Sequence, residues 1–214
     1  MTSKKRNELK CNITVETLNQ VNNFKYLGTM ITADGRCNME VKCRIGQAKA
    51  AFHKFQNIVC NKHLSLEIIK QVLEIYISSI LCYGSEAWTM NKIVENSLEA
   101  AKMWFMRRML KVPWTYKIYN VDILKQANSN RRIVKELRKR QSRFVGHVLR
   151  KGQIENIVTT GKIAGRRDRG KQREKMLDGL TKWCGKSTTE LLTAVKDRDL
   201  WRNMTANVYR HGTD

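Results

Sequence analysis

Acidic side chains that could hold a catalytic metal ion are few and scattered along this chain of 214 residues. Two-metal phosphoryl chemistry requires carboxylates that converge on a pair of ions. The aspartates include no adjacent pair, and they are Asp34, Asp122, Asp168, Asp178, Asp197, Asp199 and Asp214. Asp197 and Asp199 are two positions apart on a predicted helix, so their side chains diverge and are expected to hydrate that helix. The sequence therefore predicts no catalytic carboxylate site.

Histidines and cysteines also lack the spacing of a metal centre or a nucleophilic site. No Cys-x-x-Cys occurs, and no cysteine pairs with a histidine at zinc-site spacing. His147, in Phe-Val-Gly-His-Val-Leu, is expected to be a packed or capped histidine. No phosphate-binding glycine motif and no Gly-x-Ser-x-Gly is present. We expect no catalytic residue, no metal ligand and no cofactor in this chain.

Basic side chains offer binding chemistry instead. The chain has 41 Lys and Arg against 19 Asp and Glu, a net charge of +22 and a pI near 10.0, which favours a polyanionic partner. Residues 131–175 hold 16 basic and 4 acidic residues, so about a fifth of the chain carries a net +12. RNA or DNA is the expected partner, rather than a membrane or a small molecule. The alternative is a basic face that is only solvated. The sequence leaves the oligomeric state open.

The elements that must position these residues are mostly helices. Apolar spacings of three and four predict helices over 38–60, 65–83, 91–113 and 131–151, with Asn38, Ser65 and Asn91 as N-caps. The helix over 65–83 is apolar nearly all round, Tyr76 included, which is typical of a central helix. Before them, Val21–Gly35 reads as an antiparallel pair bent at Gly28. The fold class predicted is mainly α, with a short N-terminal β-hairpin followed by a helical bundle.

Along 131–151, the expected inward residues are Ile133, Leu137, Phe144, Val148 and Gln141. The expected outer face is basic and comprises Arg131, Arg132, Lys135, Arg138, Lys139, Arg140, Arg143 and Arg150. A Gly/Arg-rich segment follows at 161–175, and Ser187-Thr-Thr-Glu190 is typical of a capping box that opens a last helix. No apolar run is long enough to cross a membrane and no secretory signal is recognisable, so we expect reduced thiols in an intracellular protein of nucleus or cytoplasm.

Six motifs follow one another along the chain. They are Phe24-Lys-Tyr-Leu-Gly-Thr-Met-Ile-Thr-Ala-Asp-Gly-Arg36, Arg44-Ile-Gly-Gln-Ala-Lys-Ala-Ala-Phe52, Tyr83-Gly-Ser-Glu-Ala-Trp-Thr89, Met103-Trp-Phe-Met-Arg-Arg-Met-Leu-Lys-Val-Pro-Trp114, Arg140-Gln-Ser-Arg-Phe-Val-Gly-His-Val-Leu-Arg150 and Gly165-Arg-Arg-Asp-Arg-Gly170. Their order resembles that in the C-terminal part of the reverse transcriptase of LINE-type, non-LTR retrotransposons. The resemblance to this transposable-element family runs from about residue 20 to about residue 183.

The resemblance implies an architecture and a set of binding residues. Residues 1–36 would be palm-end strands and a primer-grip-like hairpin, 37–115 a thumb-like bundle, 116–160 a basic helical region, 161–175 a flexible Gly/Arg-rich segment and 176–214 the C-terminal helices. Tyr26, Leu27 and Gly28 would form the primer-grip turn, with Gly28 letting the backbone approach nucleic acid. The other implied nucleic-acid-binding residues are Arg131, Arg132, Lys135, Arg138, Lys139, Arg140, Arg143, Arg166, Arg167 and Arg169.

The family is an RNA-directed DNA polymerase that uses Mg²⁺, and its palm aspartates would lie before Met1. The expected function is therefore a nucleic-acid-binding fragment that holds a template–primer duplex through thumb and basic helix and is not catalytic alone. The alternatives are a non-functional retroelement remnant and an incomplete gene model of an active reverse transcriptase. Asp168 and Gln172 depart from the family's Gly-Arg-Gly-Arg-Pro pattern, which argues against minor-groove insertion there.

Overall fold

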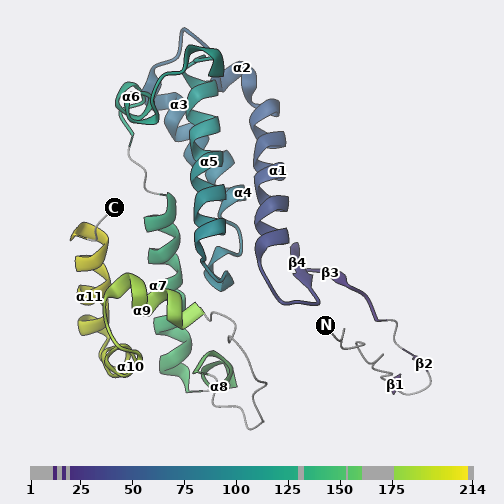
Figure 1. Cartoon of the computed structure of the whole chain (residues 1–214), viewed down its shortest axis with the longest axis vertical. Helices are drawn as coiled ribbons and strands as arrows, with labels where there is room; N and C mark the ends of the chain where they lie inside the picture. Colours follow the sequence, from purple (N-terminus) through teal and green to yellow (C-terminus); the bar gives the residue numbers. More distant parts are fainter. Residues whose placement is uncertain are drawn as a thin grey trace, which may run out of the picture.

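A β-hairpin followed by helices makes up the protein, as seen in a computed structural model (Figure 1). The structure describes residues 12–13, 16–17, 20–129, 133–152, 154–160 and 176–211. A two-residue pair, β1 (Asn12–Ile13) with β2 (Glu16–Thr17), precedes the hairpin of β3 (Asn23–Tyr26) and β4 (Thr29–Thr32). The predicted fold class, mainly α with a short antiparallel N-terminal pair, is confirmed.

The turn between β3 and β4 is set by backbone conformation. Tyr26 pairs with Thr29, which leaves a two-residue loop of Leu27 and Gly28 with φ of 46° and 81°. Two successive positive φ values are typical of a type I′ turn, whose twist matches that of the strands. Glycine adopts such a φ without a Cβ penalty, so the bend predicted at Gly28 is explained by its conformation.

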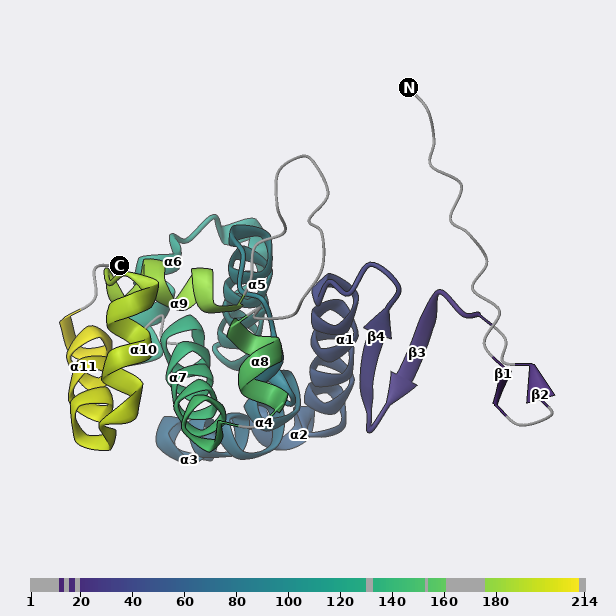
Figure 2. The same ribbon diagram turned by 90° about the horizontal axis from the view of Figure 1, so that it is seen from below.

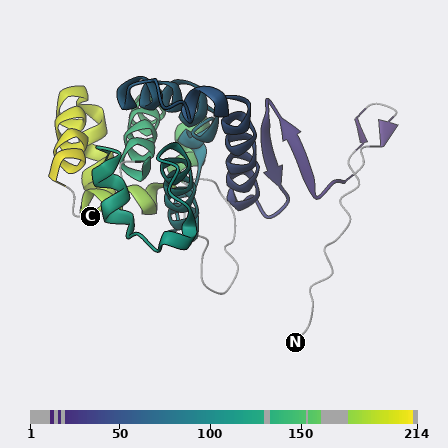
Figure 3. The ribbon, with the colours of Figure 1, turned by 90° about the horizontal axis from the view of Figure 1, so that it is seen from above.

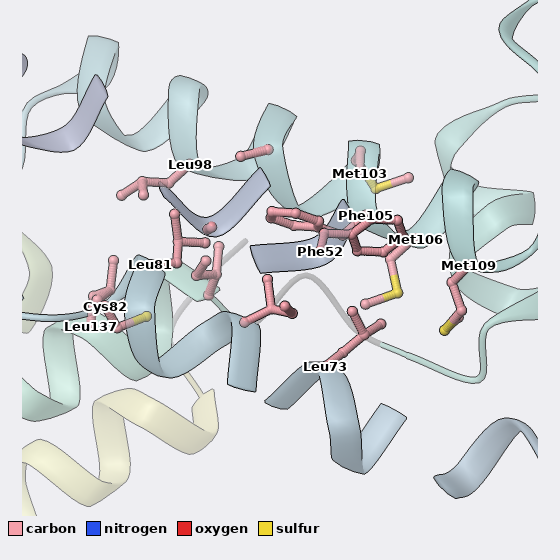
Figure 4. Packing of buried hydrophobic residues seen from close by; sticks show 14 of the residues in the cluster. Phe52, Leu73, Leu81, Cys82, Leu98, Met103, Phe105, Met106, Met109 and Leu137 are labelled. Carbon is pink, nitrogen blue, oxygen red and sulfur yellow. The ribbon is translucent and has the colours of Figure 1, made fainter. Parts of the chain in front are cut away.

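Three helical segments form the bundle beside the hairpin. They are α1 (Asn38–Lys54) with its short extension α2 (Gln56–Val59), then α3 (Leu66–Val72) continued by a π-helical stretch (Leu73–Ser78) and α4 (Ser79–Leu81), then α5 (Lys92–Met109). The core between them is aromatic and aliphatic, with Phe52, Phe105, Leu81 and Leu98 all buried (Figure 4).

The two ends of the bundle are fixed by contacts between distant residues. The thiol of Cys37, just before α1, lies 3.2 Å from the carbonyl oxygen of Thr89, just before α5. The thiol of Cys60, just after α2, lies 3.5 Å from the carbonyl oxygen of Arg108, near the end of α5. α1 and α5 therefore run in the same direction, from the hairpin end to the opposite end, and Figure 1 shows them side by side.

Several details of the helices differ from the sequence prediction. Asn38 is the first residue of α1 rather than its cap, and Cys37 precedes it without a side-chain capping bond. Ser65 and Asn91 cap their helices as predicted. Tyr76 is half exposed and stacks on Phe55, so the segment 65–83 has one solvent face instead of being apolar all round.

A second, smaller core lies under the C-terminal helices. A short 3₁₀ turn (Trp114–Tyr116) and α6 (Asn120–Gln126) lead to α7 (Ile133–Lys151), α8 (Ile154–Thr160), α9 (Met176–Cys184), α10 (Thr188–Lys196) and α11 (Arg198–His211). The first half of α7 packs in the bundle core and its second half packs with α9–α11. The predicted Ser187 capping box is present. Figures 2 and 3 show the hairpin and α11 at opposite sides, with α7 between them.

Most inward positions of α7 agree with the periodicity. Ile133, Leu137, Gln141 and Val148 are buried, whereas Phe144, predicted inward, is exposed. Within the described ranges, no helix combines the length and apolarity that a bilayer crossing requires. The five divisions of the chain expected from the resemblance stay a prediction, and the segment 161–175 lies outside the described residues.

Gly146 allows α7 and α11 to approach closely. A Cβ there would lie 2.5 Å from Nε1 of Trp201, whose ring is fixed by a 3.0 Å hydrogen bond to the carbonyl of Ser142. We expect Gly146→Ala to reduce the free energy of unfolding by about 1–3 kcal/mol through overpacking, measured by urea denaturation.

Gly46, on the exposed side of α1, is the matched control because no atom lies within 4 Å of the position that a Cβ would take there. Gly46→Ala should stabilise the protein by about 0.5–1 kcal/mol through helix propensity. Equal effects of the two substitutions would contradict the close packing inferred for α7 and α11.

Candidate nucleic-acid interface

The hairpin turn is attached to the bundle through its two backbone carbonyls. The hydroxyl of Tyr83 donates to the carbonyl oxygen of Leu27 at 3.1 Å, and Nη2 of Arg44 donates to that of Gly28 at 2.6 Å. The Arg44 guanidinium also lies over the Tyr83 ring, 4.3 Å from its centroid. Residues of α1 and of the segment after α4 therefore hold the turn together.

A buried ion pair orients the arginine that holds the turn. Nε of Arg44 lies 2.6 Å from Oε1 of Glu40, one helical turn earlier, and both side chains are almost fully buried. The other oxygen of Glu40 accepts the Met30 backbone N–H at 2.6 Å. That N–H belongs to a non-hydrogen-bonded pair of the hairpin, so without Glu40 it would have no partner in the strand ladder. The Glu40 carboxylate therefore accepts hydrogen bonds from both the Arg44 guanidinium and the Met30 backbone N–H of β4.

The turn that is held in this way presents side chains to solvent. Tyr26 is 56% exposed and Leu27 is 75% exposed. Phe24 and Ile31, which pair across the strands, are also exposed. A Cβ at Gly28 would meet Tyr83 and Arg44 at ordinary contact distances, so its positive φ, rather than crowding, is what requires glycine. Close approach of nucleic acid at Gly28 stays a prediction.

The segment from Tyr83 to Trp88 connects the turn to α7. Gly84 has a φ of 69°, and a Cβ there would lie 3.2 Å from Oγ1 of Thr29. Directly after it, the carbonyls of Ser85 and Trp88 accept hydrogen bonds from the buried Gln141 amide of α7, at 3.1 and 2.8 Å. Consecutive residues of one short segment therefore contact both the hairpin turn and the middle of α7.

The basic residues predicted on the outer face of α7 differ in their exposure to solvent. Arg140 and Arg143 are exposed, and Lys135 and Lys139 are partly exposed. Arg140 lies near Cys82, the residue directly before Tyr83. Arg131, Arg132, Arg166, Arg167 and Arg169 lie outside the described residues.

The predicted outer position is wrong for Arg138. Its side chain is buried, with Nη2 3.1 Å from the Glu95 carboxylate and 3.3 Å from the Met90 carbonyl. Nη1 packs against Gly179, where a Cβ would lie only 2.7 Å away. Arg138 therefore joins α5, α7 and α9 in the interior, because its long stem reaches across the helix face into a gap that a glycine leaves open.

Potential metal ligands and thiols are the remaining reactive groups among the described residues. Among them, no three His, Cys, Asp or Glu side chains converge on a position where they could hold a metal ion together. Burial raises the pKa of the Cys82 thiol to about 11, although the Arg140 charge opposes this, and burial likewise raises the pKa of Cys184 to about 11. Both thiols are therefore protonated and weakly nucleophilic at neutral pH.

Sequence reasoning missed the residues that hold the turn. Glu40 and Arg44 are one helical turn apart, a spacing typical of a solvent ion pair, and nothing in the sequence indicates that they face β4. Tyr83 and Gly84 belong to a motif whose pattern indicates no role for either residue. Gln141 is predicted inward, and its amide needs hydrogen-bond partners there, but the sequence does not identify them.

Comparison with known proteins supports a mobile-element connection. The chain is 26% identical over 202 residues to an uncharacterized transposon-derived protein of Caenorhabditis elegans, a match that covers 86% of this chain and 70% of that protein. No family model matches the chain. No solved structure matches it either. The similarity supports a transposon-derived origin.

Breaking the Glu40–Arg44 pair on one side should destabilise the hairpin attachment strongly. We expect Arg44→Met to cost about 3–5 kcal/mol of unfolding free energy, because the Glu40 carboxylate is left buried without its partner. Lys42→Met, at an exposed position of the same helix, should change stability by less than about 0.5 kcal/mol. Urea denaturation measures both.

The double variant Arg44→Met with Glu40→Gln should recover part of that stability, because no buried charge is then left unpaired. Hydrogen exchange at the Met30 amide should accelerate in Arg44→Met and not in Lys42→Met. Unchanged exchange at Met30 would show that the pair does not hold β4.

Proposed function

We propose that this chain is a nucleic-acid-binding part of a non-LTR retrotransposon reverse transcriptase that holds a template–primer duplex between the hairpin turn and the basic side of α7. The observation that carries the proposal is the segment from Tyr83 to Trp88, which contacts both elements. Because Tyr83 bonds the turn and Ser85 bonds α7, the two surfaces have a fixed separation. Fixed spacing suits a ligand with a regular backbone such as a duplex.

The chemistry of the two surfaces supports backbone binding without sequence choice. Arg140 and Arg143 are exposed and suit phosphate oxygens, whose contacts position a duplex but carry no sequence information. Tyr26 and Leu27 offer apolar contact at the turn, where ribose and base edges would lie. Lys135 and Lys139 extend the same basic side along α7.

The reverse transcriptase assignment rests on the order of motifs, and the transposon-derived relative is consistent with it. The uncovered apolar face of the hairpin, with Phe24 and Ile31, is also consistent with a palm, which the resemblance puts before the hairpin. The relative equally suits the alternative of an element-derived remnant. A cooperative thermal transition would favour the binding module, and its absence would favour the remnant.

Charge reversal on α7 tests the proposal. We expect Lys139→Glu, Arg140→Glu and Arg143→Glu together to weaken binding of an RNA–DNA duplex at least tenfold at low salt, measured by fluorescence anisotropy. The slope of log K against log salt should fall by roughly one for each phosphate that is no longer neutralised. Arg138 is left intact, because its removal would leave Glu95 without a buried partner and would confuse binding with folding.

The matched control makes the same charge change elsewhere. Lys196→Glu, Arg198→Glu and Arg202→Glu alter exposed residues of α10 and α11 and should leave more of the affinity than the α7 variant does. If both triple variants lose affinity equally, only total charge matters and the α7 interface is refuted.

A further inference from the structure

A hollow of about 1080 Å³ lies along α5 and the loop that follows it. Its walls come from α5 between Asn96 and Arg108, from Cys60 after α2, and from the loop that carries Trp114 and Tyr116. α5 has 18 residues and is about 27 Å long at 1.5 Å per residue, so Trp114 and Tyr116, which follow its end, are well separated from the hairpin beside its start.

Aromatic rings at this hollow are unusually exposed. Trp114 is 78% exposed, Tyr116 is 68% exposed, and Tyr119 beyond them is 81% exposed. Large rings favour burial, and three exposed rings within six residues form a patch of the kind that marks a binding surface.

The loop that carries these rings is ordered by its own contacts. Nη2 of Arg107 donates to the carbonyl of Ile118 at 2.6 Å and to Oδ1 of Asn120 at 3.0 Å. Lys117 adopts a φ of 49°, and its N–H closes the turn on the carbonyl of Trp114. The rings are therefore preorganised, which lowers the entropic cost of binding a ligand.

Arg107 has hydrogen-bonding capacity that the protein does not use. Its side chain is buried, and neither Nε nor Nη1 has a hydrogen-bond partner among the residues that the structure describes. The guanidinium lies under the Trp114 ring, 5.0 Å from its centroid, so one face of the ring is supported by a cation and the other faces solvent. Nε and Nη1 point to different sides of the guanidinium, so each is a separate N–H donor that suits a phosphate oxygen.

The charge around the hollow agrees with a phosphate-bearing ligand. Its lining includes three basic residues, Arg107, Arg108 and Lys111, and one acidic residue, Glu99. The exposed Lys117 directly follows the lining residue Tyr116 and adds a further positive charge. Arg108 also lies over a further lining ring, that of Trp104. Cations alternating with open aromatic faces are the chemistry of single-strand binding, in which bases stack on rings and phosphates meet basic groups.

We propose that this hollow binds single-stranded RNA or DNA, with bases stacked on Trp114 and Tyr116 and phosphates held by the basic residues around it. A single strand is the occupant because a paired duplex keeps its base faces covered, whereas an unpaired strand offers them to the rings. This site is separate from the duplex interface on α7 and does not depend on it.

The test compares side chains of similar apolarity with and without aromatic faces. In the full chain, Trp114→Leu with Tyr116→Leu should weaken binding of a labelled oligothymidine of about ten nucleotides by at least tenfold, since each stacked base contributes substantially. Trp114→Phe with Tyr116→Phe should retain most of the affinity. Because both positions are exposed, circular dichroism melting should be the same for all three proteins.

Specificity is measured with a long duplex and with the α7 charge-reversal variant. The leucine variant should bind the duplex as tightly as the unchanged protein does, and the α7 variant should still bind the oligothymidine. If the leucine variant binds the oligothymidine as tightly as the unchanged protein, the proposal is wrong, and the patch is a docking surface for another class of macromolecule.

Discussion

The guanidinium of Arg44 is the group on which the arrangement of hairpin and bundle depends. This buried group meets the buried Glu40 carboxylate, the Gly28 carbonyl and the Tyr83 ring. Each of these partners comes from a different part of the chain. A buried guanidinium has five donors and tolerates few geometries, so it fixes the angle between elements more narrowly than apolar packing does.

A buried arginine donates to a loop carbonyl at two other places in the protein. Arg138 donates to the carbonyl of Met90, before α5, and Arg107 donates to that of Ile118, before α6. In each case a loop carbonyl near a helix end lacks a partner within the helix or the sheet, and a buried arginine supplies one. Part of the large positive charge of the chain is therefore structural, and counting basic residues overestimates the surface available to nucleic acid.

Local physics determines most of the elements, which is why the sequence predicted them well. Apolar periodicity located the long helices, Ser65, Asn91 and Ser187 marked helix starts, and Gly28 marked the hairpin turn. These signals depend on neighbours within a few residues.

The division of basic residues into surface and interior was not predictable, because it depends on contacts between residues that are far apart in the sequence. Arg138 belongs with its basic neighbours on the helical wheel, and only the absence of a side chain at Gly179, 41 positions later, leaves space for it. Phe144 shows the converse, since an aromatic residue predicted inward is exposed. At the candidate site, the turn and the exposed cations of α7 were predictable, whereas the ion pair that holds the turn was not.

The buried polar contacts also bear on whether the chain is a folded module or a decayed remnant. Holding the turn requires Glu40, Arg44 and Tyr83 together, and holding α7 requires Gln141 opposite the Ser85–Trp88 carbonyls. Removing Glu40, Arg44 or Gln141 would leave a buried polar group unsatisfied, at a cost of about 1–3 kcal/mol or more for a charge. Random substitution has many ways to break such a set and few to complete it, so the complete set argues for a maintained fold.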